Sequence, residues 1–180
     1  DFVVSVVDPA GVERSYNSPL RRDRAEFVVL DAAHPGRHLI ILNSEEFTGA
    51  TDRHELQVSA LPAGNGDAAR VAALRLMSEA AAANSKATEQ SARVALAAYT
   101  SAAELWRTDG IREYAQTLYS IAMLQYWWTY DMAQAAENAA RAASLYRQLL
   151  EPSLEANALS LQAAALIESP SGSDDYRVAL

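Results

Sequence analysis

Two Arg-His pairs are the first residues of this chain whose types and spacing could do chemistry. The stretches GRHLIIL (36–42) and DRHELQV (52–58) each place a histidine, His38 or His54, before or within an apolar run. A protein zinc site needs three or four ligands oriented by further partners. The remaining histidine, His34, lies in a Pro-Gly turn, and the triplet HEL lacks the second histidine of an HExxH helix. We therefore predict no metal ion and interpret His38 and His54 as structural side chains of a sheet.

The other catalytic templates are also missing from the sequence. The chain has no cysteine, which removes disulfides, thiolate metal sites and a cysteine nucleophile. The stretch PAGNGD lacks the Lys-Ser/Thr of a phosphate-binding loop, and no Gly-x-Ser-x-Gly elbow occurs. The acidic pairs Glu45-Glu46 and Asp174-Asp175 fall in predicted loops, where solvated surface is the usual role. We expect neither a catalytic residue nor a cofactor in this chain.

Charge and hydropathy limit the partners. The chain of 180 residues carries 15 Lys+Arg and 23 Asp+Glu, a net charge of −8, and no basic stripe. Nucleic acid is therefore not an expected partner. No run reaches the roughly 18 to 20 apolar residues of a membrane span, so we expect no membrane insertion. The chain shows no signal peptide and opens within a strand pattern, DFVVSVVD, so we expect it to belong to a longer protein.

The first third of the chain has the alternating pattern of β-strands. DFVVSVVD (1–8) is followed by DPAG (8–11), which has the Pro and Gly positions of a type I turn, and by VERSYNS (12–18) as the returning arm. Further strands are predicted at 25–32 and 52–61, and between them 34–44 is predicted to be a turn followed by a strand. Short strands with closely spaced turns predict a partial antiparallel β-sandwich over residues 1–61.

The remainder of the chain has a helical period. A linker at 62–66 separates the strands from an all-α region at 67–169, and 170–180 is a tail or the start of the next repeat element. Helices are predicted at 67–84, 88–107, 111–130, 132–149 and 153–168. The stretch ALAAYTSAAELWR (95–107) matches AAENAARAASLYR (135–147). Every matched pair is separated by the same number of positions, from 95 to 135, and we call this separation the repeat offset. A fixed period with one helix pair per unit predicts a stacked α-solenoid.

The helical region resembles tetratricopeptide repeats in a variant longer than the usual unit of about 34 residues. Gln125 departs from this pattern because it stands where tyrosine is common, and YWWTYD (126–131) carries one extra residue in the turn. The resemblance implies an all-α tetratricopeptide-like α-α superhelix that binds peptides. The positions that carry it are the LWR and LYR endings, Leu118, Ile121, Ala122, Ala135 and Ala142.

The strand region resembles the C-terminal part of the pre-peptidase β-sandwich. In that family a D-P-x-G hairpin precedes two Gly-x-Tyr strands, and His38 and His54 occupy the tyrosine positions here. The order of sandwich, Ala-rich helix and repeats is similar to the N-terminal region of bacterial CHAT-domain (caspase-like) proteins. This resemblance implies a periplasmic or secreted location and a catalytic domain outside this chain.

The helix predicted at 111–130 is apolar over more than one face. Its stripe of Tyr119, Met123, Tyr126 and Tyr130 is either core between neighbouring helices or the lining of a peptide-binding groove. Of the two adjacent indoles, Trp127 is predicted nearer the groove and Trp128 nearer the core. Few of the predicted lining residues are charged, so the ligand is expected to be apolar or aromatic. By analogy with the repeats, the groove residues are Gln116, Tyr119, Met123, Tyr126 and Trp127.

These observations predict a non-catalytic interaction or regulatory region of a larger bacterial protein, with a protein or peptide partner. One alternative is a substrate-positioning region of a caspase-like CHAT peptidase. Another is a structural spacer or an oligomerisation arm. Because a solenoid needs about three repeats, the last helix (153–168) is predicted to leave an apolar face open. This face would be covered by a second copy of the chain in a homo-oligomer, by the sandwich, or by the tail 170–180.

Overall fold

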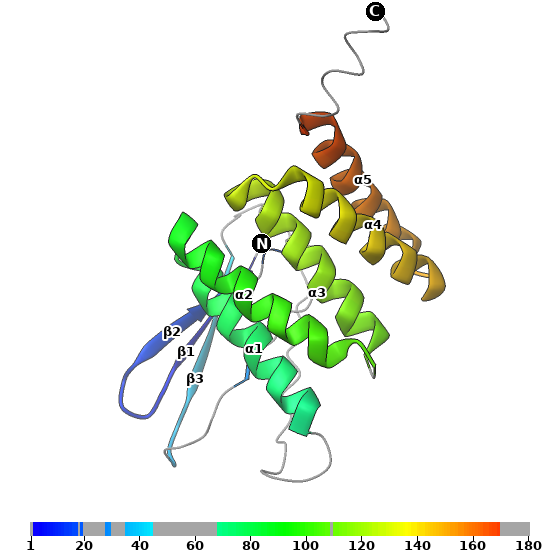
Figure 1. The fold of residues 1–180 in the computed structure, drawn as a ribbon. Coiled ribbons are helices and arrows are strands. Elements are labelled where there is room, and N and C mark those ends of the chain that lie inside the picture. Colours follow the sequence, from blue (N-terminus) through cyan, green and yellow to red (C-terminus); the bar gives the residue numbers. More distant parts are fainter. Residues whose placement is uncertain are drawn as a thin grey trace, which may run out of the picture.

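The structure is a computed structural model that describes residues 2–17, 19, 28–29, 35–44, 68–108 and 110–169. Within these ranges a small three-stranded antiparallel sheet is followed by five α-helices in chain order (Figure 1). The predicted order of a β region before an all-α region is confirmed at this level.

The sheet is built around the opening strand. Its strands are β1 (Phe2–Val7), β2 (Glu13–Tyr16) and β3 (Leu39–Ser44), in the spatial order β2-β1-β3. The predicted hairpin between the first two strands is confirmed, since the amide of Gly11 donates to the carbonyl of Asp8 at 2.9 Å. The Asp8 carboxylate also accepts hydrogen bonds from the amides of Ala10 and Val12 at 2.8 and 2.9 Å. The side chain of Asp8 therefore stabilises the turn together with its backbone carbonyl.

The other predicted strands are only partly within the described residues. The strand predicted after the turn within 34–44 is confirmed as Leu39–Ser44, which pairs antiparallel with β1. Of the predicted strand at 25–32, only residues 28–29 are described, and these two are not in a strand. The predicted strand at 52–61, with His54, lies outside the described residues, as does His34. The structure thus describes a three-stranded sheet where the sequence predicted five strands of a sandwich.

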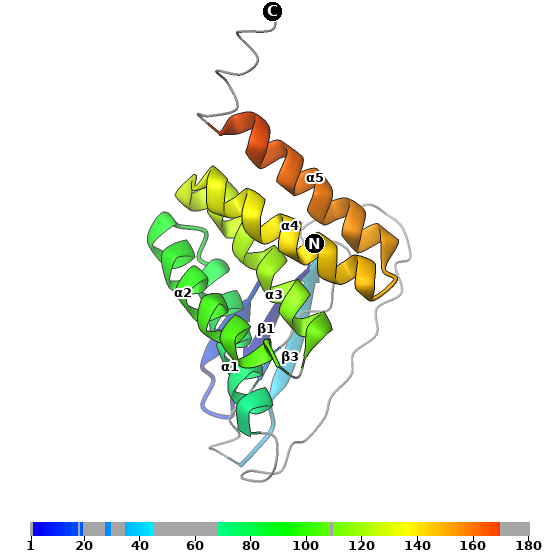
Figure 2. The same cartoon turned by 45° about the vertical axis from the view of Figure 1, so that its right-hand side comes forward.

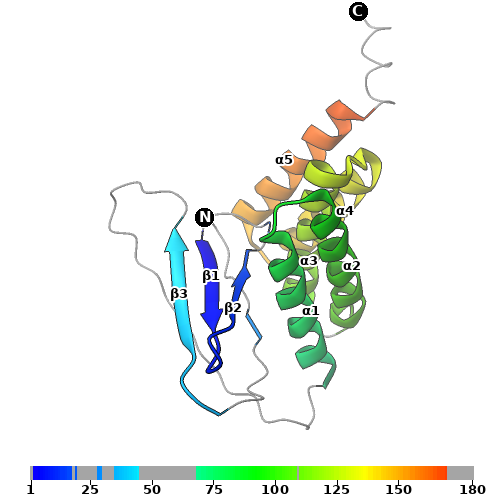
Figure 3. The same cartoon turned by 90° about the vertical axis from the view of Figure 1, so that its left-hand side faces the viewer.

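The sheet packs on the first helix, α1 (Ala68–Asn84). Val4, Val6 and Tyr16 form one buried cluster with Ala81 of this helix. Polar contacts continue the same junction, because Asn84 donates through Nδ2 to the carbonyl of Asn17 at 2.8 Å. Figure 3 shows β2 as the strand that faces α1. The strands and the helical array therefore share one contact surface.

The helices follow one another as a row in which each packs against the next (Figures 1 and 2). Each predicted helix is present and its ends lie close to the predicted ones, although the end of the third is not α-helical. Thr88 caps the second helix through a capping box with Ser91, and Pro152 occupies the first turn of the last helix as predicted. After α1 the elements are α2 (Glu89–Trp106), α3 (Ile111–Leu124), the π-helical turn η2 (Gln125–Thr129), α4 (Met132–Gln148) and α5 (Pro152–Glu168).

The sequence repeat is also a repeat of packing. Ala95, Ala102 and Trp106 of α2 are buried, and so are their counterparts at the repeat offset on α4, which are Ala135, Ala142 and Tyr146. Small alanine side chains at these positions allow close helix approach, while the large aromatic ring fills the end of each interface. None of the helices in the described ranges is both long and apolar enough to cross a membrane.

Candidate protein-binding surface

The joint between α3 and α4 is a π-helical turn. Over Gln125–Thr129 the α-helical hydrogen-bond ladder widens, and the carbonyl of Gln125 accepts from the amide of Asp131 at 3.1 Å. A π turn accommodates one residue more than the same length of regular α-helix. Tyr130 ends the turn in the left-handed conformation, with φ at 54°. This conformation is uncommon for a bulky residue and persists only where the surroundings hold it.

A buried polar pair anchors the turn to α4. Nδ2 of Asn138 donates to Oε1 of Gln125 at 2.9 Å, and both side chains are buried. A buried amide without a partner would cost more than the net value of the bond, so each residue depends on the other. The buried side chain of Gln125 is therefore matched by a polar residue on the facing helix.

Three successive aromatic side chains leave this turn in different directions. Tyr126 packs against the cluster that includes Met132 and Ala165, from α4 and α5. Trp128 packs against the core formed by α1, α2 and α3. Trp127 lies between them and remains 52% exposed, with its ring edge-to-face against Tyr126 at a centroid distance of 4.9 Å. The burial of the two indoles follows the predicted order, with Trp128 on the core side.

Tyr126 also links the turn to the last helix. Its hydroxyl donates a short hydrogen bond to the carboxylate of Glu168, near the end of α5. This hydrogen bond, with smaller contributions from burial and from the carboxylate charge, raises the pKa of Tyr126 above the usual value of 10.0. The bond fixes the position of the Tyr126 ring, against which Trp127 rests.

The structure separates the five predicted groove residues into three groups. Gln116 is buried, at 6% exposure, and so does not lie on an exposed surface. Tyr119, Met123 and Tyr126 are half-buried, and all three pack against the small cluster of Ala122, Ala139 and Leu161. Trp127 is the most exposed of the predicted set. Tyr130, which belongs to the same predicted stripe, is 72% exposed.

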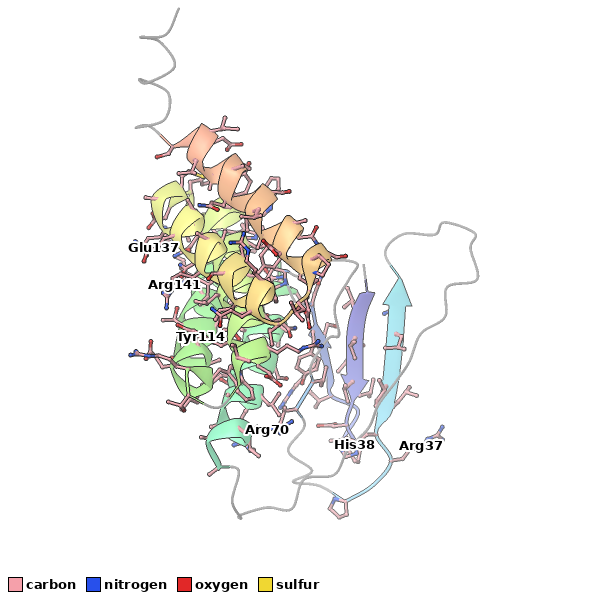
Figure 4. The ribbon with its side chains drawn as sticks, turned by 90° about the vertical axis from the view of Figure 1, so that its right-hand side faces the viewer. Arg37, His38, Arg70, Tyr114, Glu137 and Arg141 are labelled. Atoms are coloured by element: carbon pink, nitrogen blue, oxygen red, sulfur yellow. The ribbon has the colours of Figure 1, made fainter. Side chains whose placement is uncertain are left out.

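A second polar contact between α3 and α4 was not predicted. Nη2 of Arg141 donates to the hydroxyl of Tyr114, and the guanidinium lies 5.9 Å from the centroid of that ring. Glu137 precedes Arg141 by one turn on α4, and both side chains are exposed (Figure 4). An acidic and a basic residue at this spacing are a sequence signal for an exposed, charged helix face. Arg37 and His38 lie well apart from this group, at the start of β3.

The described residues contain no group of three His, Asp or Glu side chains that could hold a metal ion. No protein-family model, curated protein or solved structure matches this chain. We use the term aromatic surface for Trp127, Tyr130 and the exposed part of Tyr126.

Proposed function

We propose that this chain is a non-catalytic protein-interaction region, with a tetratricopeptide-like helical array that binds a protein or peptide segment at the aromatic surface. The observation that supports the proposal best is the exposure of Trp127, at 52%, on a turn that both neighbouring helices hold in place. Trp and Tyr are the side chains most enriched among residues that dominate binding energies at protein interfaces.

Anchoring of the turn lowers the cost of binding. A side chain that is ordered before binding loses less conformational entropy when a partner arrives. Trp127 is supported by the edge-to-face contact with Tyr126, whose hydroxyl is in turn bonded to Glu168. The backbone beneath it is held by the buried Gln125–Asn138 pair. An indole presented in this way offers a large apolar area at low entropic cost.

The chemistry of the surface favours an apolar or aromatic partner segment. Acidic residues border the aromatic surface, with Asp131 after the turn and Glu168 beside Tyr126. The chain as a whole carries a net charge of −8. Like charges would oppose a partner that ends in a carboxylate or has acidic flanks. The proposed ligand is thus an apolar segment that is neutral or basic at its edges.

The proposed binding surface extends along α3 only as far as the side chains of this helix are accessible. Tyr119 and Met123 retain partial exposure and would continue the proposed binding surface along α3. Gln116 is left out of the proposed surface because it is buried.

Peptides selected from a random displayed library against the whole chain would test this function. The dissociation constant of a selected peptide would be measured with the wild-type chain and with the Trp127→Ala, Tyr130→Ala and Val94→Ala variants. Val94 is the matched control, because it is an apolar side chain of similar exposure, 54%, on α2 and does not belong to the aromatic surface. We expect Trp127→Ala to weaken binding by roughly thirtyfold, which corresponds to about 2 kcal/mol for a dominant interface residue. We expect Val94→Ala to have no effect.

The melting temperature of each variant distinguishes a loss of peptide binding from a loss of folding. Trp127→Ala should melt close to the wild type, since half of its side chain is already in water. Selected peptides that bind the Trp127→Ala and Tyr130→Ala variants as tightly as the wild type would contradict the proposed surface.

A further inference from the structure

The last helix carries an apolar stripe on the side that faces away from its neighbours in the described part of the chain. Ala158, Leu161 and Ala165 of α5 are buried on the side that packs on α4, and α5 ends the row of helices (Figure 2). At about 100° per residue, the apolar residues that α5 exposes lie on the opposite side. A helix that is apolar on two sides is typical of an interior position. The exposed residues of this side, which we call the α5 stripe, are Pro152, Ala156, Leu159, Ala163 and Leu166.

The spacing of the α5 stripe is that of a coiled-coil seam. Its residues follow one another at steps of four, three, four and three positions, which is the alternation of the a and d positions of a heptad. The side chains also alternate in size, with alanine at 156 and 163 and leucine at 159 and 166. Leu159 and Leu166 are 40 and 51% exposed. Such a seam suits a second helix, because each large side chain inserts between residues of the facing helix.

The corresponding side of α3 shows which kind of element covers these positions in the helical array. The α3 counterparts of Leu159, Ala163 and Leu166 at the repeat offset are half-buried, and residues of α4 and α5 pack on them. Helices therefore cover this side of α3, and a helix is the element expected on the α5 stripe.

A second copy of α5 that runs in the opposite direction complements this seam. With a two-fold axis at the level of Leu161, Leu159 of one copy lies opposite Ala163 of the other. In the same arrangement Leu166 lies opposite Ala156. Each leucine of the stripe is thus opposite an alanine, so the two helices can approach closely without overlap of large side chains. A two-fold interface requires this self-complementarity, because the same surface is used by both copies.

The charges of α5 also permit this self-association. The residues of the α5 stripe are uncharged, and so are Ser160 and Gln162, which flank the stripe near the two-fold axis. The two carboxylates of α5 have partners elsewhere, since Glu155 forms an ion pair with α4 and Glu168 accepts a hydrogen bond from Tyr126. Although the chain carries a net charge of −8, the α5 stripe can therefore meet its own copy without like charges in the seam.

We propose that two copies of this chain form a homodimer in which the α5 helices pack antiparallel along the α5 stripe. A helix of 17 residues is about 25 Å long. A single pair of such helices buries an area at or below the low end of stable interfaces, about 1,200 Å² in total. The dimer is therefore weak and reversible. Its seam uses none of the residues of the aromatic surface, so it does not rest on the proposed binding of a peptide.

Sedimentation equilibrium of the whole chain tests the interface. We expect the average mass to rise from that of one chain toward that of two at micromolar concentrations and above. Ala163→Glu places a carboxylate in the seam opposite Leu159 and should weaken the dimer at least tenfold. The matched control is Asn157→Glu, which adds the same charge at an exposed position of α5 outside the stripe. It should dimerise like the wild type, and circular dichroism would verify that both variants fold.

Two results of this measurement would overturn the proposal. One is a wild-type chain that remains monomeric up to its solubility limit, because the stripe would then be covered within the chain or remain open. The other is an Ala163→Glu variant that dimerises as tightly as the wild type, because the dimer would then use another surface.

Disulfide trapping between copies tests the antiparallel register. The chain has no native cysteine, so Leu159→Cys and Ala163→Cys each introduce a single thiol. Equal amounts of the two variants would be mixed and oxidised with oxidised glutathione, and the linked dimers would be identified by mass. We expect the mixed 159–163 disulfide well above the half that random pairing gives. A random distribution, or an excess of the 159–159 and 163–163 products of a parallel pair, would overturn the proposal.

Discussion

The side-chain amide of Asn138 donates to the side-chain oxygen of Gln125 at 2.9 Å, and the pair joins α4 to the π turn at the end of α3. Both residues are buried, so this hydrogen bond is shielded from water. It is the buried side-chain contact between α4 and the turn from which Trp127 projects. The stability of the turn should therefore respond to changes at either residue.

Removal of one partner of this pair should be more harmful than removal of both. Asn138→Ala leaves Oε1 of Gln125 buried without its donor, and we expect a loss of about 1 to 3 kcal/mol in the free energy of unfolding. Urea denaturation monitored by circular dichroism measures this loss. The control is the double variant Gln125→Leu with Asn138→Leu, which should be less destabilised than Asn138→Ala. A single variant as stable as the wild type would show that the pair does not anchor the turn.

The two adjacent indoles should differ in their contribution to stability. Trp128 packs on the core of α1, α2 and α3, whereas Trp127 is half in water. Truncation of a fully buried aromatic side chain costs about 3 to 5 kcal/mol. Trp128→Ala should approach the lower part of that range, and Trp127→Ala should cost clearly less. Thermal and urea unfolding of the two variants would reveal the order, and the reverse order would remove the basis for the aromatic surface.

Gly110 is required by the close approach of Trp106. Gly110 precedes α3, and a Cβ atom added to it would lie 2.6 Å from Cε3 of the buried Trp106 ring. Gly110→Ala should thus force a shift of the ring or of the helix start and cost about 1 to 3 kcal/mol.

A double-mutant cycle with Trp106→Phe identifies this clash. The smaller ring should make Gly110→Ala less costly than it is in the wild-type background, as measured by denaturant unfolding. Equal costs in the two backgrounds would mean that the ring does not impose the glycine.

The hydrogen bond between Tyr126 and Glu168 predicts a pH dependence at the alkaline end. Because the pKa of Tyr126 is raised in the folded chain, its contribution to stability is fully present below the unfolded value of about 10. The contribution is lost as the pH rises through the folded pKa, when the phenolate faces the carboxylate.

Glu168→Gln should lower the pKa of Tyr126, because it removes the charged acceptor. Difference ultraviolet titrations isolate this group when each background is compared with its own Tyr126→Phe variant. The same pKa in wild type and Glu168→Gln would show that the carboxylate does not hold the hydroxyl.

The sequence by itself determined the five helices, the first hairpin and the order of a strand region before a helical one. The Ala and Leu period, Pro152 and the turn around Gly110 located the helices closely, because these signals act over a few neighbouring residues. The DPAG turn determined the first hairpin for the same reason. In the match of 95–107 with 135–147, equal residues at equal spacing are buried alike on α2 and α4.

Only the tertiary structure decided how the third helix ends and which of its aromatic residues reach solvent. Its periodicity continues through Gln125, and the π turn there is bonded to Asn138, a residue of the facing helix. The stripe of Tyr119, Met123 and Tyr126 looks the same in sequence whether it lines a groove or packs on neighbours. α4 and α5 half-bury it, and they leave Trp127 exposed. A side-chain pattern specifies an apolar face, but what covers that face depends on contacts between segments far apart in the chain.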